Sequence, residues 1–239
     1  MTEFSDLWKA QVDPDLWIVA AAAGLALLLV AYGPAWRVSR NVVTIAHEGG
    51  HALVALLTGR KLDGIRLHSD TSGVTVSRGR PDGAGMVLTA LAGYIAPPLL
   101  GLLFAWLLEI GRITLMLWFA LALLAGMLLM IRNAFGVVSV LTTGGIVFAV
   151  SWFAPTEVQA AFAYFGAAFL LLAGARPVIE LQRLRARRQA PSSDADQLAH
   201  LTGVPGLVWV CFFGLVSLAC LVLGGKLLIP AETWQSSPF

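Results

Sequence analysis

Charged residues are scarce in this chain of 239 residues, where Asp, Glu, Lys and Arg together make up only 13%. With 58% hydrophobic residues and a mean hydropathy of +0.79, this scarcity excludes an ordinary soluble domain and indicates an integral membrane protein. The net charge is only +2, and no basic run interleaved with aromatics indicates a nucleic-acid partner. The two cysteines, Cys211 and Cys220, both lie in the last apolar segment and are interpreted as small apolar residues.

Seven apolar segments account for most of the sequence. They run over residues 16–35, 41–58, 84–108, 113–131, 134–153, 157–175 and 205–229. A membrane helix needs about twenty such residues, so most of them qualify and the short second one does not. The first follows no basic leader and has no cleavage site, so it is interpreted as a retained transmembrane helix. We divide the chain into an N-terminal segment with this helix (1–40) and a membrane core (41–239).

The short second segment carries His47-Glu48-Gly49-Gly50-His51, an HExxH motif. Two histidines four residues apart lie one turn apart on the same helix face, so both imidazoles can reach one metal ion. Glu48 is placed to act on a metal-bound water without binding the metal itself. Histidines and carboxylates are costly in hydrocarbon and are retained there mainly for function. The motif therefore predicts a catalytic zinc site rather than a chance match.

A second polar element follows the motif. Apolar and polar residues alternate at Ile65/Leu67 and at Val74/Val76 around a turn-forming Asp70-Thr-Ser-Gly73, which predicts a β-hairpin with an open strand edge. The five arginines within 176–188 place that connection in the cytoplasm by the positive-inside rule. Counting helices back from there, residues 41–80 begin and end on the cytoplasmic side.

The fold class predicted is an all-α polytopic membrane protein with about six transmembrane helices, a re-entrant HExxH helix and a small β-hairpin. A re-entrant helix is expected because residues 41–80 return to the side on which they start. The zinc site would then lie in a water-filled cleft that opens to the cytoplasm, since backbone that is not helical needs water or protein around it.

The third zinc ligand must come from a distant part of the chain, because a catalytic site usually has three protein ligands and HExxH supplies two. Acidic residues at predicted outer helix ends, among arginines or in turns are set aside. They are Glu109, Glu157, Glu232, Glu180, Asp63, Asp70 and Asp82. Asp194 and Asp196 remain, in a polar segment where Ser192, Ser193 or Asp194 can cap a short helix. His200 is a minor alternative.

Several short motifs are distributed over residues 41–210. They are Ala46-His-Glu-Gly-Gly-His-Ala52, Gly73-Val74-Thr75, Ala92-Gly93-Tyr94, Arg132-Asn133-Ala-Phe-Gly136, and Ser193-Asp194-Ala195 with Leu201-Thr-Gly-Val-Pro205. Through them the chain resembles the site-2 protease family of intramembrane zinc metallopeptidases, in particular its compact bacterial branch. The better-known members carry a ligand aspartate in a Leu-Asp-Gly motif of a later membrane helix. The one such tripeptide here, Leu62-Asp63-Gly64, follows too closely after the HExxH helix for that role.

The resemblance implies that His47, His51 and Asp194 bind zinc and that Glu48 is the catalytic base. It implies further that Asn133 helps to hold the scissile carbonyl, although a helix cap is its simpler interpretation. The expected location is the bacterial plasma membrane, with the lipid bilayer and transmembrane protein substrates as partners.

The leading functional prediction is hydrolysis of peptide bonds in membrane proteins, with an unwound substrate strand added to the hairpin edge at Val74 and Val76. The alternative is a non-catalytic scaffold or accessory subunit of a larger membrane complex, because a fold does not determine its function. Metal transport is disfavoured, since intramembrane carboxylates are too few for a relay. Asp196 stays the rival of Asp194; on one helix the two point about 160° apart, and Asp196 is expected to be an exposed first-turn acid.

Overall fold

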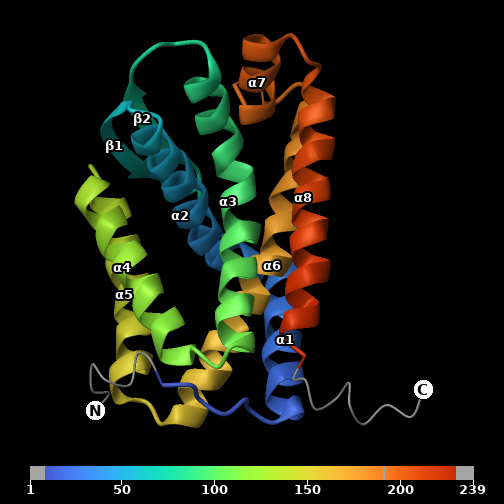
Figure 1. Cartoon of the computed structure of the whole chain (residues 1–239). Helices are drawn as coiled ribbons and strands as arrows, with labels where there is room; N and C mark the ends of the chain where they lie inside the picture. Colours follow the sequence, from blue (N-terminus) through green and yellow to red (C-terminus); the bar gives the residue numbers. More distant parts are fainter. Residues whose placement is uncertain (1–8, 191, 230–239) are drawn as a thin grey trace.

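The computed structural model describes residues 9–190 and 192–229, and helices dominate this part of the chain (Figure 1). A single two-stranded sheet lies at one end of the helices. The elements in chain order are α1 (Leu16–Ala31), α2 (Gly33–Leu57), β1 (Lys61–Leu67), β2 (Gly73–Arg78), α3 (Ala84–Glu109), α4 (Ile113–Met130), α5 (Ala134–Phe153), α6 (Thr156–Ala186), α7 (Asp194–Thr202) and α8 (Gly206–Leu227).

Five of the described helices, α3, α4, α5, α6 and α8, are long and apolar enough to cross a membrane. The number rises to six if α1 and α2, which meet at 102°, together form one bent span. This confirms the prediction of a polytopic all-α membrane protein with a small hairpin. The arginine-rich segment that the sequence analysis treated as a connection after residue 175 is largely helical, because α6 continues without a break to Ala186.

The HExxH motif lies on α2, which is longer than the predicted 41–58 segment and begins directly after α1. Tyr32 is extended between the two helices, and Pro34 follows in the first turn of α2, where its missing N–H leaves no hydrogen bond unmade. The predicted division at residue 40 therefore falls inside a helix. In Figure 1, α1 occupies the lower part of the molecule and α2 rises from there to the hairpin.

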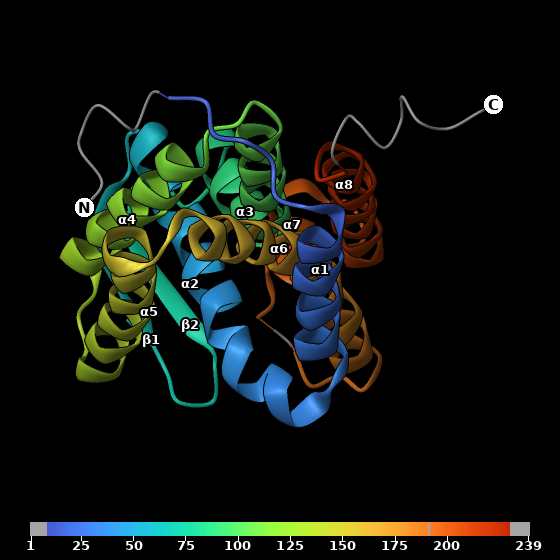
Figure 2. The ribbon, with the colours of Figure 1, turned by 90° about the horizontal axis from the view of Figure 1, so that it is seen from below.

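The largest apolar cluster joins α1, α3, α4 and α6 around fully buried side chains such as Tyr164, Leu117 and Leu171. Figure 2 shows α3 and α6 in the interior, with the other helices around them. Glycine lets these two helices approach closely, since a Cβ at Gly174 would lie 2.9 Å from a Pro98 side-chain carbon. This rigid pair carries α2 on one side and α7 with α8 on the other.

The hairpin is held along one of its edges by the segment between α4 and α5. Ile65 of β1 forms a parallel bridge with Ile131, and the Arg132 amide donates to the Ile65 carbonyl at 2.8 Å. The Asn133 side chain extends this pairing, because its Nδ2 donates to the Leu67 carbonyl at 2.7 Å and its Oδ1 accepts from the Leu67 amide at 3.2 Å. In the described residues no strand pairs with the other edge, which belongs to β2.

Candidate metal centre

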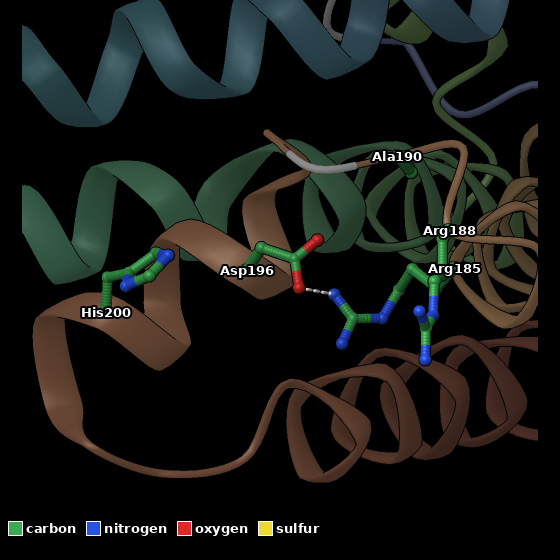
Figure 3. A pocket seen from close by; sticks show the side chains of 5 residues that line it. All are labelled: Arg185, Arg188, Ala190, Asp196 and His200. Atoms are coloured by element: carbon green, nitrogen blue, oxygen red, sulfur yellow. Dashed lines mark hydrogen bonds and ion pairs between the residues drawn. The ribbon is translucent and has the colours of Figure 1, made fainter.

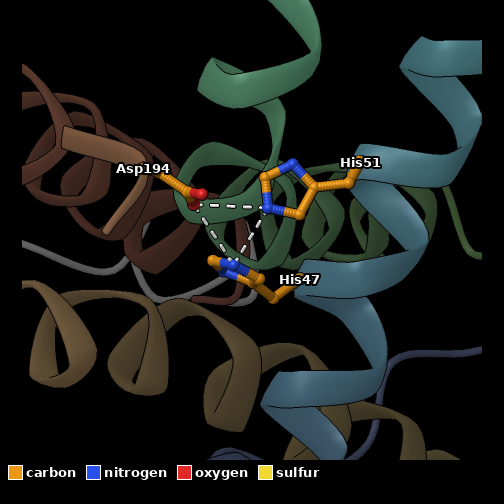
Figure 4. Close-up of side chains that lie close together, drawn as sticks. All are labelled: His47, His51 and Asp194. Carbon is orange, nitrogen blue, oxygen red and sulfur yellow. Dashed lines mark hydrogen bonds and ion pairs between the residues drawn. The ribbon is translucent and has the colours of Figure 1, made fainter. Parts of the chain in front are cut away.

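Three ligand atoms from two distant segments of the chain converge on one another (Figure 4). The Nε2 atoms of His47 and His51 lie 3.1 Å apart, and Asp194 Oδ2 lies 3.3 Å from the first and 3.2 Å from the second. Ligands about 2.0–2.1 Å from a tetrahedral zinc ion would be about 3.3 Å apart, so the triangle has the size that such an ion requires.

The contact of His51 with Thr89 determines how its ring would face a metal ion. His51 Nδ1 is 2.7 Å from the Thr89 carbonyl oxygen, which can only accept, so the proton of a neutral imidazole lies on Nδ1. Its Nε2 then presents a lone pair to His47 and Asp194, as metal-binding histidines do. Asp194 Oδ2 is buried and has no hydrogen-bond partner in the described part of the chain. These observations fit a metal ion bound by the three side chains.

Space for the ion is provided by Gly93, in the helix that packs against α2. A Cβ on Gly93 would lie 2.3 Å from His51 Nε2 and 2.6 Å from His47 Nε2. Gly50 serves the same packing from the other side, since its Cβ would be 2.4 Å from that of Ala96. The two glycines therefore let α2 and α3 approach until both histidines face a shared space. Gly49, by contrast, has only an ordinary contact with Met127.

Gly93→Ala is therefore expected to abolish stoichiometric zinc binding, because the added methyl group occupies the space between the two histidines. Alanine favours a helix over glycine by about 1 kcal/mol, so the loss would not come from helix propensity. Metal content of the purified protein, measured by atomic emission, checks the prediction. Gly126→Ala is the matched control, because a Cβ there meets nothing within 4 Å. A Gly93→Ala protein that retains one zinc per chain would contradict this geometry.

Glu48 is buried, with 4% of its surface exposed, and is held by β2 rather than by a metal ligand. The Thr75 hydroxyl lies 2.6 Å from Glu48 Oε2 and donates to it, which leaves Oε1 without a partner from this strand. Gly73 allows the carboxylate to lie against β2, because a Cβ there would be 2.6 Å from Oε1. The Thr44 hydroxyl also donates to the Thr71 carbonyl at 2.8 Å, so the hairpin is anchored along α2.

A cleft of about 130 Å³ opens beside His47 and Glu48. One wall is the polar face of α2, the second is the start of β2, and the third is formed by Tyr94 of α3 and Pro177 of α6. The Tyr94 ring packs edge-on against His47 at 4.9 Å and stacks on Phe213 of α8. The carboxylate and the imidazole thus line one and the same cleft.

Asp194 reaches this centre from the first turn of α7. Ser193 is the N-cap of that helix, and Gly203 ends it in a left-handed conformation, as the sequence predicts. Burial favours a neutral carboxyl, but without an ion in the centre the charge of a protonated His51 and the polar contacts with both imidazoles outweigh it and lower the pKa of Asp194. The anionic form that a metal ligand needs is therefore the stable one.

The other candidate ligands have different partners. The expectation that Asp196 is an exposed first-turn acid is wrong, since it is half-buried and paired with Arg185. Glu180 accepts from Arg176 and from Trp36, which confirms its predicted pairing with arginine. Asp63 pairs with Arg78 at 2.6 Å. The remaining alternative, His200, lies in a separate pocket with Asp196.

Of the predicted substrate-binding residues, Asn133 is bound at both ends of its amide to the Leu67 backbone and is not the side-chain cap of α5, while its second N–H has no part in these bonds. Val74 and Val76 are about half exposed on β2.

Comparison with known proteins identifies the family. A model of the family described as Peptidase M50B-like matches residues 18–224, which is most of the chain. The chain belongs to this family. The match confirms the resemblance to site-2 proteases, and with the apolar helices it supports an integral membrane protein. Comparisons with curated proteins and with solved structures found no significant match.

Within this M50B-like protein, three residues of the centre were not predicted as functional from the sequence. Gly93 makes room for the ion, Thr89 orients His51 through its carbonyl, and Thr75 holds Glu48. Gly93 and Thr75 lie within the short motifs that carry the family resemblance, which is the one signal that could have identified them. Thr89 acts through its backbone, so no side-chain pattern marks it.

Proposed function

We propose that the protein is an intramembrane zinc metalloprotease of the site-2 type that hydrolyses peptide bonds of membrane proteins. The observation that carries the proposal is the buried Glu48 carboxylate at the same cleft as three converging metal-ligand atoms. A structural metal site would need the three ligands but not this acid beside an opening. When bound, zinc would supply a Lewis acid for the scissile carbonyl and lower the pKa of water.

The roles of the protein's own groups follow from their contacts. Glu48 accepts a proton from the attacking water and returns it to the leaving amine. Thr75 holds Oε2, so Oε1 is the oxygen that exchanges the proton. Thr89 keeps the His51 proton on Nδ1 and away from the metal-binding side. Burial of Glu48 excludes bulk water and strengthens each of these interactions.

The substrate strand is proposed to pair with the free edge of β2. The Ile65 carbonyl and both peptide groups of Leu67 bind the segment between α4 and α5, so these groups point away from β2. Peptide directions alternate along an antiparallel pair, so the groups opposite them, on Gly73 and Thr75, point away from β1. These outward groups offer hydrogen bonds to an added strand next to the cleft. Val74 lies opposite Arg66, and its peptide faces β1.

Val74→Pro is expected to lower cleavage efficiency at least about tenfold while zinc content stays at the wild-type level. Proline removes the Val74 amide that faces β1 and loosens the strand whose outer edge binds the substrate. Kinetics with a transmembrane peptide measure the effect, and Val74→Ala, which retains the amide, is the matched control. Unaltered kinetics in the proline variant would show that the hairpin does not take part in substrate binding.

The same pairing can be tested from the substrate. Methylation of single backbone amides in the peptide should impair cleavage at every second position over the segment that contacts β2, because only alternate amides face the edge. Loss without this period of two would exclude strand addition, even if the peptide is still hydrolysed.

The experiment that tests the proposed function uses purified protein in lipid nanodiscs with a panel of transmembrane peptides. Wild type is expected to cleave at least one peptide, and Glu48→Ala none. Identical products from both proteins would reject the protease function. A protein without zinc that co-purifies with another membrane complex would support the scaffold or accessory-subunit alternative.

We also propose that the protein lies in a bacterial plasma membrane with the cleft open to the cytoplasm. In support, the arginine-rich end of α6, the hairpin and α7 lie at the same end of the molecule (Figure 1). A membrane-impermeant reagent applied to cytoplasmic and periplasmic faces, with a cysteine introduced in the hairpin turn at Ser72, tests this orientation. Labelling from the periplasmic side would overturn it.

A further inference from the structure

The position of Asp194 depends on how α7 is held, because this ligand alone comes from outside α2. In the described residues, the contacts of its carboxylate are with His47 and His51, the other two members of the metal centre, and none is with another part of the chain. Ala195 and Leu198 are fully buried against α3, α6 and α8, so the apolar face fixes where α7 lies. That face does not fix the first turn, which carries the ligand.

The first turn is tied to α6 by Arg185 (Figure 3). Its guanidinium donates to Asp196 Oδ1 and, at 3.3 Å, to the Ser193 hydroxyl. Ser193 in turn donates to Asp196 Oδ2 at 2.6 Å, so one arginine binds the residues on both sides of Asp194. Only 17% of the Arg185 side chain and 24% of the Asp196 side chain is exposed, which distinguishes this pair from a solvated surface ion pair.

The location of the guanidinium is electrostatically unfavourable without Asp196. It lies against the first residue of α8, where a Cβ on Gly206 would be 2.3 Å from Arg185 Nη2. A helix N-terminus carries a partial positive charge, which disfavours a cation there. Gly206 thus makes room for the guanidinium, which in the described residues donates to Asp196 and Ser193. A plain surface arginine would need neither the glycine nor the buried partner.

We propose that Arg185 and Asp196 are positioning residues that fix the metal ligand Asp194, and that Gly206 leaves the space that the Arg185 guanidinium occupies. The proposal rests on the metal centre of the proposed function. Outside the pair lies an open pocket of about 260 Å³, lined also by Arg188, Ala190 and His200, so no close packing holds the pair on that side. Loosening the pair should therefore let Asp194 move away from the histidines.

The test measures zinc affinity of the full chain in nanodiscs by competition with a fluorescent chelator. Arg185→Met and Asp196→Asn are each expected to weaken zinc binding about 10- to 100-fold, the range seen when a residue that orients a ligand is removed. The double variant should bind zinc as weakly as either single variant, because both remove the same contact. Arg80→Met and Asp82→Asn, which break an exposed pair in the loop before α3, should leave affinity unchanged.

The double variant separates positioning from damage by an unpaired buried charge. The double variant leaves no unpaired charge. If it recovered wild-type zinc affinity, each residue would only neutralise the buried charge of the other without positioning Asp194, and the proposal would be overturned. Single variants with wild-type affinity would overturn it as well. If the wild type binds zinc and the variants bind it with the same affinity, only this inference is rejected. If the wild type does not bind zinc, the metal centre is rejected and the inference with it.

Gly206→Ala gives an independent check, since its methyl group would displace the guanidinium from α8. It should weaken zinc binding when Arg185 is present and have no further effect in the Arg185→Met background. An equal loss in both backgrounds would mean that Gly206 acts through helix packing, which contradicts its assigned role.

Discussion

Glu48→Gln is expected to abolish peptide hydrolysis while the protein retains one zinc per chain. Glutamine keeps the shape of the side chain, and its carbonyl oxygen can still accept from Thr75, so the residue stays in place against β2. What is lost is the basicity that accepts the proton of water. A general base contributes about 10²- to 10⁴-fold to a rate, and cleavage should fall by at least that range. Product analysis checks the loss of hydrolysis, and metal content measured on the same preparation checks the retention of zinc.

The control for Glu48→Gln removes a carboxylate outside the centre. Glu109 lies exposed at the end of α3, so Glu109→Gln should cleave as fast as wild type. Loss of zinc together with activity in Glu48→Gln would mean that Glu48 is a ligand or that α2 has collapsed. Retained activity would place the base elsewhere.

The parts of the centre that can be predicted from the sequence are those encoded within one helix turn. The relative positions of His47, Glu48 and His51 on a helix are determined by its 3.6 residues per turn, so that the two histidines on one face can be predicted without tertiary information. The α7 boundaries are similar, because Ser193 and Gly203 satisfy the helix ends locally. The membrane helices could also be predicted locally, because the length and apolar composition of a single segment are enough to identify them.

The rest depends on contacts between distant segments, which leave no periodic signal. The bend between α1 and α2 and the continuation of α6 through residues 176–186 are set by packing against neighbouring helices. The Asn133 amide completes the sheet edge at Leu67, 66 residues away, a contact that the sequence did not predict. Asp196 was expected in solvent because Arg185 lies in a different helix. In each case a polar group has a partner that the local sequence does not show.

Asp194→Asn is expected to remove zinc and activity together. The amide is nearly isosteric and leaves α7 in place, but it is a neutral and poor ligand, so only the two histidines remain for the ion. Three protein ligands are usual for a catalytic zinc, and two would not hold it at stoichiometric level. Emission spectroscopy gives the metal content, and cleavage of a transmembrane peptide gives the activity.

Comparison with Asp196→Asn decides which aspartate is the ligand. Asp194 faces both imidazoles and Asp196 faces Arg185, so Asp194→Asn should lose zinc entirely while Asp196→Asn should only bind it more weakly. Both variants remove one negative charge from the same turn of α7, so a difference between them cannot come from net charge. The opposite order would make Asp196 the ligand and would require α7 to rotate by about 160°. Full zinc occupancy in both would exclude α7 from the centre; since Asp63 and Glu180 are already paired with arginines, His200 would then be the first residue to test.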